Sequence, residues 1–242
     1  MNQLRVQDVH KRFGGVHALT GASLQVKKNT ITALIGPNGS GKTTLFNCIS
    51  KLVKQDSGSL HLQETNLSHA QAHEVARRVS RTFQDPRLFR HLTIQDHLAI
   101  ASSTRDEQLL RALTKKSFNK QTAQQALKQV GLDKPLTTRA SELSYGQRKL
   151  LDLAVAIQKP HEILLLDEPV AGVNPRLREQ IKDVLKQLRE QKETILVIEH
   201  DMNFVMDVAD TIHVLAQGRV IATGTPQEIR DDPAVLEAYL GE

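Results

Sequence analysis

The nine residues GPNGSGKTT at 36–44 carry the strongest chemical signal in the sequence. They complete the spacing G-x-x-x-x-G-K-[ST], in which successive backbone N–H groups and a helix N-terminus can surround phosphate oxygens. We expect Lys42 to reach the β- and γ-phosphates of a nucleotide as a point charge, and the Thr43 hydroxyl to ligate Mg²⁺. Chance would produce this spacing in on the order of 1% of chains this long, so a glycine-rich turn with a solvated lysine is the weaker interpretation. The residues expected to bind the nucleotide here are Gly36, Pro37, Asn38, Gly39, Ser40, Gly41, Lys42, Thr43 and Thr44.

Two acidic residues follow an apolar run further along the chain, in ILLLDEP at 163–169. Open α/β sheets place their ligands beyond the carboxyl ends of the strands, which is where Asp167 and Glu168 stand. We expect Asp167 to hold Mg²⁺ directly or through water, and Glu168 to orient and polarise the attacking water. Two solvated acids at a strand end are common, but that interpretation is weaker in a chain that also carries the phosphate loop.

A second candidate phosphate site lies in LSYGQ at 143–147, which opens a predicted helix. The N–H groups and hydroxyl of Ser144 and Gly146 would be free at the positive end of this helix. Many helices begin with Ser and Gly simply as caps, and for this segment taken alone the capping interpretation is the stronger one.

These residues need a scaffold, and the apolar patterns indicate a sheet. VQDVHKRF at 6–13 and ASLQV at 22–26 alternate in the manner of half-buried strands. ITALI at 31–35, EILLL at 162–166 and TILVIE at 194–199 are continuous apolar runs, typical of a sheet covered on both faces. These runs alternate with helical stretches, which argues for a mainly parallel α/β core.

Helical patterns fill much of the remaining chain. The segment 175–191 has apolar residues at helical spacing: Leu177, Ile181, Val184, Leu185 and Leu188. Between about residues 92 and 158 the strand signals stop, and three stretches carry helical periodicity: 106–116, 119–132 and 146–159. We therefore expect a helical subdomain inserted into the core. Near the end, 211–224 predicts a hairpin that turns at Gln217 and Gly218.

Composition excludes several classes of protein. The 242 residues are 39% apolar, enough for a buried interior, and the formal charge of +5 is modest. Only 3% are aromatic and Trp is absent, so the stacking platforms of a single-strand nucleic-acid binder are scarce and we expect no nucleic-acid partner. No apolar run approaches the roughly 20 residues that cross a bilayer, and the N-terminus lacks a secretory core. The single cysteine, Cys48, is predicted to be a small buried side chain in a reducing compartment.

Taken together, five motifs resemble those of ATP-binding-cassette (ABC) ATPases in order and spacing. They are GPNGSGKTT, RTFQDPRLF, LSYGQRK, ILLLDEP and VIEHD, and the resemblance covers essentially the whole chain. It implies an α/β fold: a P-loop NTPase core with an antiparallel β subdomain and an inserted helical subdomain at about 92–158, all within one nucleotide-binding domain at 1–242. The implied cofactors are ATP and Mg²⁺.

The resemblance also assigns further site residues. It implies that two chains close head to tail, so that each ATP lies between the loop at 36–44 of one chain and Ser144, Gly146 and Gln147 of the other. Gln84 resembles the glutamine that senses Mg²⁺ and the attacking water, and His200 the switch histidine at the γ-phosphate. Phe13 stands where the family places an aromatic that stacks on adenine, although a Phe that ends a strand is usually just packed.

Two departures point to one branch of the family. Tyr145 replaces the first glycine of the commoner LSGGQ, and Asn174 stands where many relatives have an aspartate. Together with FGGVHAL, AGVNP, IEHDM and the segment 224–241, these features resemble the ATP-binding subunits of branched-chain amino-acid importers. The implied partners are a second ATPase subunit (a copy or a paralogue), transmembrane permease subunits contacted at about 84–100, and indirectly an extracytoplasmic solute-binding protein. The implied location is the cytoplasmic face of the cell membrane.

Three alternatives remain open. The chain could serve an importer for another small solute such as urea. It could be a soluble ABC ATPase of DNA repair or translation, although those usually carry tandem cassettes or long coiled-coil insertions, which are absent from this sequence. It could also bind ATP without hydrolysing it, against which stand intact Lys42, Glu168 and His200.

Overall fold

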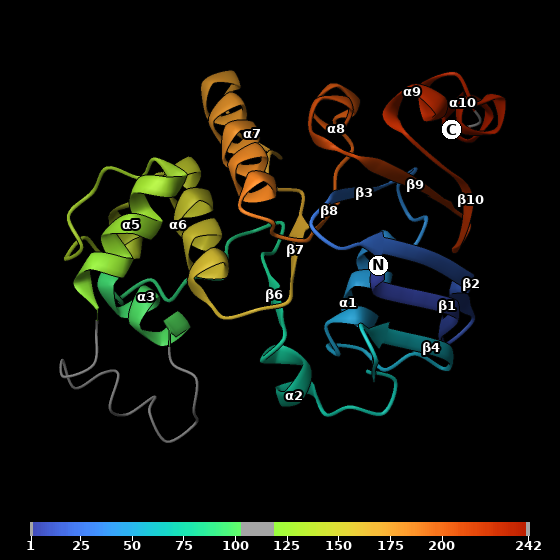
Figure 1. Cartoon of the computed structure of the whole chain (residues 1–242), viewed down its shortest axis with the longest axis horizontal. Coiled ribbons are helices and arrows are strands. Elements are labelled where there is room, and N and C mark those ends of the chain that lie inside the picture. Colours follow the sequence, from blue (N-terminus) through green and yellow to red (C-terminus); the bar gives the residue numbers. More distant parts are fainter. Residues whose placement is uncertain (1, 103–118, 241–242) are drawn as a thin grey trace.

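A six-stranded sheet forms the centre of the molecule. The computed structural model describes residues 2–102 and 119–240. The strand order is β10-β9-β3-β8-β7-β6, in which the five strands from β9 to β6 are parallel and β10 is antiparallel to β9 (Figure 1). The strands are β3 (Ile31–Ile35), β6 (Val79–Arg81), β7 (Ile163–Asp167), β8 (Ile195–Ile198), β9 (Thr211–Ala216) and β10 (Arg219–Gly224). The predicted parallel α/β core is therefore confirmed, as is the hairpin that turns at Gln217 and Gly218.

Both faces of this sheet are covered, which explains the continuous apolar runs. Alternate residues of β3 and β7 point to opposite sides: Leu34 and Leu165 belong to one apolar cluster, whereas Ala33 and Leu164 belong to the other. All four side chains are fully buried. When both faces of a strand are buried, polar and apolar residues do not alternate along it, and its sequence is a continuous apolar run.

A second, antiparallel sheet packs near the N-terminus. Its order is β2-β1-β4-β5, and its strands are β1 (Asn2–Phe13), β2 (Val16–Lys27), β4 (Ser57–Leu62) and β5 (Thr65–Asn66). Helix α1 (Lys42–Ile49) packs between the two sheets, with Phe46 and Cys48 fully buried in the cluster that both sheets share. Burial raises the pKa of the Cys48 thiol to about 11. The predicted antiparallel unit and the buried cysteine are both confirmed.

Helices connect β6 to β7 within the described part of this connection. They are α3 (Ile94–Ser102), α5 (Lys120–Val130), the short 3₁₀ helix η2 (Ala140–Glu142) and α6 (Tyr145–Gln158). Asn119 caps the start of α5 and Gly131 ends it with a φ of 68°. Two of the three predicted helical stretches are therefore observed, and the third, 106–116, lies outside the described residues. These helices gather on the left of Figure 1, away from the antiparallel sheet on the right.

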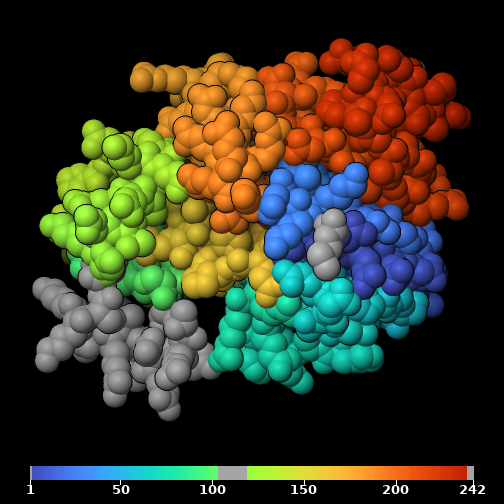
Figure 2. All heavy atoms as spheres, viewed as in Figure 1, coloured from blue at the N-terminus to red at the C-terminus, as the bar shows by residue number. Residues whose placement is uncertain are grey.

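Five further helices complete the described part of the chain. They are α2 (Ala72–Ala76), α7 (Pro175–Glu190), α8 (Met202–Val208), α9 (Pro226–Arg230) and α10 (Pro233–Leu240). In the space-filling view of Figure 2, the surface of α6 and α7 (yellow and orange) lies between that of α5 (green) and that of the N-terminal strands (blue). Within 2–102 and 119–240, no helix combines the length and the apolar character needed to cross a bilayer.

Candidate functional site

The phosphate loop begins where β3 ends and closes into the first turn of α1. Gly36 has a φ of 145°, and a Cβ built on it would lie 2.0 Å from the carbonyl oxygen of Leu215 in β9. Gly41 has a φ of 106°, and its Cβ would lie 2.4 Å from the carbonyl oxygen of Ala18. Any other residue would be excluded sterically at both positions, because the loop passes against the backbone of β9 and β2. The first turn of α1 holds no acidic residue, so its positive end favours an anion.

Lys42 holds its ammonium group over the loop. The side chain is 8% exposed, and Nζ donates to the carbonyl oxygens of Gly36 at 2.6 Å and Pro37 at 2.8 Å. Thr43, the next residue, is exposed in the first helical turn, as are Asn38 and Gly39 in the loop. A lysine ammonium group and the backbone N–H groups of such a loop can together bind phosphate oxygens.

Asp167 ends β7 and is paired with a buried arginine. Arg81 Nη2 donates to Asp167 Oδ2 at 2.8 Å, and both side chains are 6% exposed. Arg81 Nη1 donates to Asn47 at 2.8 Å and to Ser50 at 3.0 Å, while its guanidinium stacks on Phe46. Because Arg81 stands at the end of the neighbouring strand β6, this pair ties two strand ends to α1.

The residues at this edge are suited to Mg²⁺ bound together with a nucleotide. Arg81 engages Oδ2 of Asp167, and the Thr43 hydroxyl is exposed at the start of α1. No cluster of three or more His, Cys, Asp or Glu side chains that could hold a metal occurs among the described residues. Mg²⁺ usually takes one or two protein oxygens plus phosphate and water rather than a protein cage. A hydroxyl and one carboxylate therefore fit this ion.

Glu168 meets two of the other predicted residues. Gln84 Nε2 donates to Glu168 Oε2 at 2.9 Å, and His200 Nδ1 lies 3.7 Å from the same oxygen. The side chain of Glu168 is 19% exposed and that of His200 61%. Glu168 has a φ of 48°, unusual for a residue with a Cβ, and its N–H donates to the carbonyl oxygen of Ile198 at 3.0 Å. The three side chains converge beyond the ends of β6, β7 and β8, where a water molecule could be oriented.

The Ser144 end of α6 is built differently. Ser144 is exposed, its hydroxyl accepts from the N–H of Gln147 at 3.3 Å, and Gln147 Oε1 accepts from the N–H of Ser144 at 3.0 Å. This is a capping box, so the capping interpretation is correct for the single chain. A Cβ on Gly146 would lie 2.5 Å from a terminal methyl group of Leu177 in α7, so a larger residue there would require the Leu177 side chain to move. Helix α6 and helix α1 lie in different halves of Figure 1, so one chain does not bring the two candidate phosphate sites together.

The two departures from the family pattern each have a structural role. Asn174 caps α7, with Oδ1 accepting from the N–H of Leu177 at 2.9 Å and Pro175 at the first helical position. The ring of Tyr145 lies beside Gly172, where an added Cβ would be 3.4 Å from the ring. Phe13 is 46% exposed at the end of β1, with Lys11 Nζ 5.2 Å from the ring centroid, so it is not packed into the core.

Four charged residues around the site were not predicted: Arg81, Lys149, Asp152 and Glu199. Glu199 is fully buried directly after β8, and its carboxylate accepts from the N–H of Val170 at 2.9 Å and of His200 at 3.2 Å. Burial raises the pKa of this carboxyl. An acid at the end of an apolar run was the available signal, but the predicted strand included Glu199, whereas β8 ends at Ile198.

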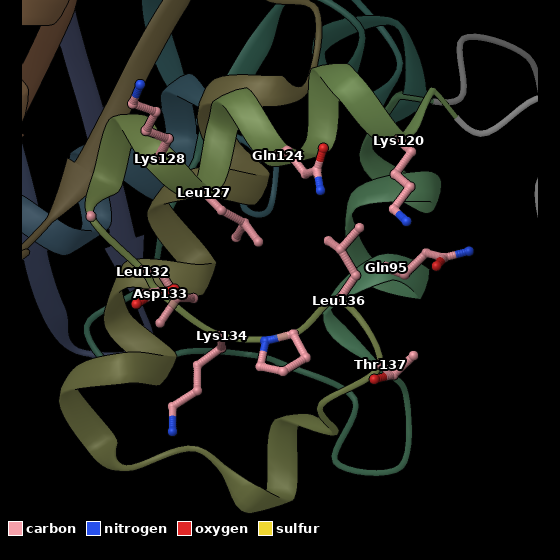
Figure 3. A pocket seen from close by; sticks show the side chains of 12 residues that line it. Gln95, Lys120, Gln124, Leu127, Lys128, Leu132, Asp133, Lys134, Leu136 and Thr137 are labelled. Atoms are coloured by element: carbon pink, nitrogen blue, oxygen red, sulfur yellow. The ribbon is translucent and has the colours of Figure 1, made fainter.

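A cavity of about 660 Å³ lies elsewhere, between α5 and the loop that follows it. Figure 3 shows Lys120, Lys128 and Lys134 around its rim, with Leu127 and Leu136 reaching inward. None of the residues predicted to bind nucleotide lines it. The edge of the sheet described above, rather than this cavity, combines the loop, the acids and the histidine.

Comparison with known proteins agrees with this geometry. A family model described as ABC transporter matches residues 19–171. This chain belongs to the ABC transporter family. It is an ATPase subunit with a nucleotide-binding fold, as the sequence resemblance predicted. A second model, described as Branched-chain amino acid ATP-binding cassette transporter, matches residues 219–242.

Relatives and solved structures match along the whole chain. The high-affinity branched-chain amino acid transport ATP-binding protein LivG of Salmonella typhimurium is 39% identical over 99% of this chain and 98% of its own length. The corresponding BraF protein of Pseudomonas aeruginosa is 38% identical over the same shares. The crystal structure of an ATP-binding cassette of an ABC transporter in its ADP conformation superposes with a TM-score of 0.85 at 33% identity, covering 100% of both chains.

Proposed function

We propose that this chain is the ATP-hydrolysing subunit of an importer for branched-chain amino acids. The observation that carries this proposal is the similarity to LivG and BraF along the full length, including the C-terminal segment 219–242. Most of that segment forms β10, α9 and α10, at a distance from the phosphate loop in sequence. Similarity there goes beyond what a shared nucleotide site would require.

The chain would hold ATP through the phosphate loop. Lys42 would turn from the carbonyl oxygens of its own loop to the β- and γ-phosphates, as the loop amides bind the remaining oxygens. Thr43 and Asp167 would hold Mg²⁺, which when bound neutralises charge on the phosphates. Arg81 Nη2 donates to Asp167 Oδ2 and so fixes this carboxylate at the strand end.

Glu168 would orient the attacking water, and its neighbours would orient Glu168. Gln84 already donates to the Glu168 carboxylate, and His200 stands beside it on an exposed loop from which it could reach a γ-phosphate. Phosphoryl transfer depends chiefly on positioning and charge stabilisation, which this arrangement supplies. Replacing Glu168 by Gln should therefore abolish most ATP turnover while leaving nucleotide binding intact.

The second half of each ATP site would come from another subunit. Ser144, Gly146 and Gln147 lie on an exposed helix end that a partner's nucleotide can approach. A head-to-tail pair, of two copies or of one copy and a paralogue, would bring this end to the partner's phosphate loop. Phe13 would stack on the adenine, since its ring is exposed.

The rest of the importer would bind outside the nucleotide site. We place the contact with permease subunits at residues 84–100, where Phe89 is 65% exposed and Arg87 and Arg90 are exposed beside it. The solute-binding protein would act through those permeases, and this chain would sit at the cytoplasmic face of the membrane. In this view 1–242 is a single nucleotide-binding domain, with the helical subdomain at about 92–158 inserted in it. Crosslinking from Arg87 or Phe89 to a copurified permease would test the contact.

The transport role is tested by uptake of labelled leucine, isoleucine and valine in source cells that carry Lys42→Ala. Urea and other neutral amino acids are the comparison solutes. Selective loss of branched-chain uptake supports the proposal. Loss of urea uptake alone would identify urea, rather than branched-chain amino acids, as the transported solute. Unchanged uptake of every solute in cells that lack other importers would overturn the transport role.

A further inference from the structure

Helix α6 carries two charged side chains on the side of the catalytic edge, Lys149 buried and Asp152 half-buried. Lys149 is 5% exposed, and its Nζ donates to the backbone carbonyl oxygen of Glu168 at 2.7 Å. Asp152, one turn later on the same face, lies beside the backbone of Phe83, and the two residues line one small cavity. Burial lowers the pKa of Lys149 and raises that of Asp152 to about 7. A lysine buried at such a cost normally serves a specific partner.

The partner of Lys149 is a backbone in an unusual conformation. Glu168 has a φ of 48°, in the left-handed region that a side chain disfavours. Its N–H is fixed by Ile198, and its carbonyl oxygen is fixed by Lys149. The two bonds hold both peptide groups of the residue whose carboxylate must point at the attacking water.

The partner of Asp152 leads to the same carboxylate. Phe83 directly precedes Gln84, whose amide donates to Glu168 Oε2 at 2.9 Å. Lys149, Asp152, Phe83 and Pro169 also line one small cavity of about 10 Å³, so they are immediate neighbours. The contacts therefore form a closed ring from α6 through Asp152, Phe83 and Gln84 to Glu168, and back through Lys149 to α6.

We propose that Lys149 and Asp152 are positioning residues that fix Glu168 and Gln84 to helix α6. Because Ser144 begins this helix, the ring links the chain's own catalytic edge to the surface offered to the partner's nucleotide. A shift of α6 would move Glu168 and Gln84 with it. This inference rests on the proposed role of Glu168.

The first test removes the ammonium group of Lys149 and compares the effect with the same substitution at a matched lysine. Lys159, at the other end of α6, is also desolvated, and its Nζ donates to the carbonyl oxygen of Val79 at 2.9 Å, away from Glu168. Lys149→Met should lower kcat for ATP about tenfold or more, with KM within about twofold, because a hydrogen bond from a charged donor is lost. Lys149→Arg should restore most of the rate. Lys159→Met should leave kcat within about twofold.

A structural readout accompanies the rates. Amide hydrogen exchange in residues 167–173 should accelerate in Lys149→Met and not in Lys159→Met, since only the first releases the Glu168 peptide. Unchanged kcat and unchanged exchange in a folded Lys149→Met protein would overturn the proposal. Equal losses of kcat in both methionine variants would also overturn it, because they would indicate general destabilisation.

The second test uses pH. The charge that acts on Asp152 is that of Lys149, which also interacts electrostatically with Glu199, Glu168 and Asp85. The ionised form of Asp152 attracts the backbone N–H of Phe83 more strongly than the protonated form does, so kcat should fall as the pH drops through about 7. Asp152→Asn should be slow at every pH and lack this step, whereas a step retained in Asp152→Asn would exclude Asp152 as its source.

The failure of this inference can be distinguished from that of the proposed function. If Glu168→Gln keeps its turnover, the role of Glu168 is wrong whatever Lys149 does. If Glu168→Gln is inactive but Lys149→Met is normal, only the positioning role is wrong. If Lys149 acts through Glu168, adding Lys149→Met to Glu168→Gln should not reduce the residual turnover further.

Discussion

The phosphate loop and the Ser144 end of α6 both present hydrogen-bond donors at a helix N-terminus, where a phosphate group can bind. They differ in what holds them in place. At the loop, a lysine that is 8% exposed lies over backbone held against β9 and β2. At Ser144, an exposed hydroxyl and the Gln147 side chain satisfy each other's backbone amides within four residues. The first region is fixed by the core of its own chain. The second is complete as a helix cap and gains a further role only from a surface outside the chain.

The largest difference between the two regions should appear in stability. Arg81→Met should lower the free energy of unfolding by about 3–5 kcal/mol, because it leaves the Asp167 carboxylate buried without its partner. Ser144→Ala removes only an exposed cap and should cost about 1 kcal/mol. Urea denaturation of the two variants measures both. If the two variants lost similar amounts of unfolding free energy, the buried Arg81–Asp167 pair would not make the loop region more dependent on the core than the Ser144 region.

The second largest difference between the two regions should appear in ATP binding to the single chain. Lys42→Ala should reduce ATP turnover by at least about 100-fold and weaken nucleotide binding to the single chain, since the loop loses its only lysine. Lys54→Ala, an exposed lysine just beyond α1, is the matched control and should change neither. Equilibrium dialysis with ATP gives the binding, and phosphate release gives the rate. Full binding by Lys42→Ala would contradict the assignment of the loop.

Ser144→Arg should lower turnover by about tenfold or more while leaving nucleotide binding to the single chain unchanged. Ser141→Arg, an exposed neighbour in η2, serves as the control. In a head-to-tail pair of copies, mixing Ser144→Arg with Lys42→Ala chains places both changes in one ATP site and leaves the other intact. Turnover should then recover above that of either variant alone. If mixed dimers form but their turnover does not recover, the loop of one chain and the Ser144 end of the other do not share an ATP site.

The smallest effect concerns pH. Glu199 is buried beside His200, and burial raises the pKa of its carboxyl. Between the unfolded and the folded pKa the native chain keeps a proton that the unfolded chain has lost, so this residue's contribution to stability falls as the pH rises from about 4.5. Thermal unfolding of Glu199→Gln should lack that component and show a shallower decline of midpoint over this range. A slope identical to wild type would exclude Glu199 as a source.

The sequence predicted the parts of the site that obey simple positional rules. A loop after an apolar run, and acids at the end of another, placed Lys42 and Asp167 at one edge because parallel strands end together. The resemblance to ABC ATPases added Gln84 and His200, and the structure brings both to Glu168. Their catalytic roles remain predictions.

The residues that were missed are charges inside otherwise apolar faces. Lys149 precedes buried Leu150 and Leu151 in α6, where a lysine in a helical pattern is normally assigned to the solvated face. Its burial depends on the Glu168 carbonyl, which the chain brings to it from 19 residues away. Arg81 likewise acquires its role from Asp167 in a neighbouring strand. Pairings of this kind are set by tertiary contacts, and local patterns do not encode them.

Cys48 gives the chain a practical advantage for experiments on its surface. It is the sole cysteine, it is fully buried in α1, and its thiol has a pKa of about 11. Because thiolates rather than thiols react with alkylating probes, the native protein should show almost no labelling background near neutral pH. A cysteine introduced at Phe89 or Ser144 could therefore carry a spectroscopic or crosslinking probe in the otherwise unaltered sequence.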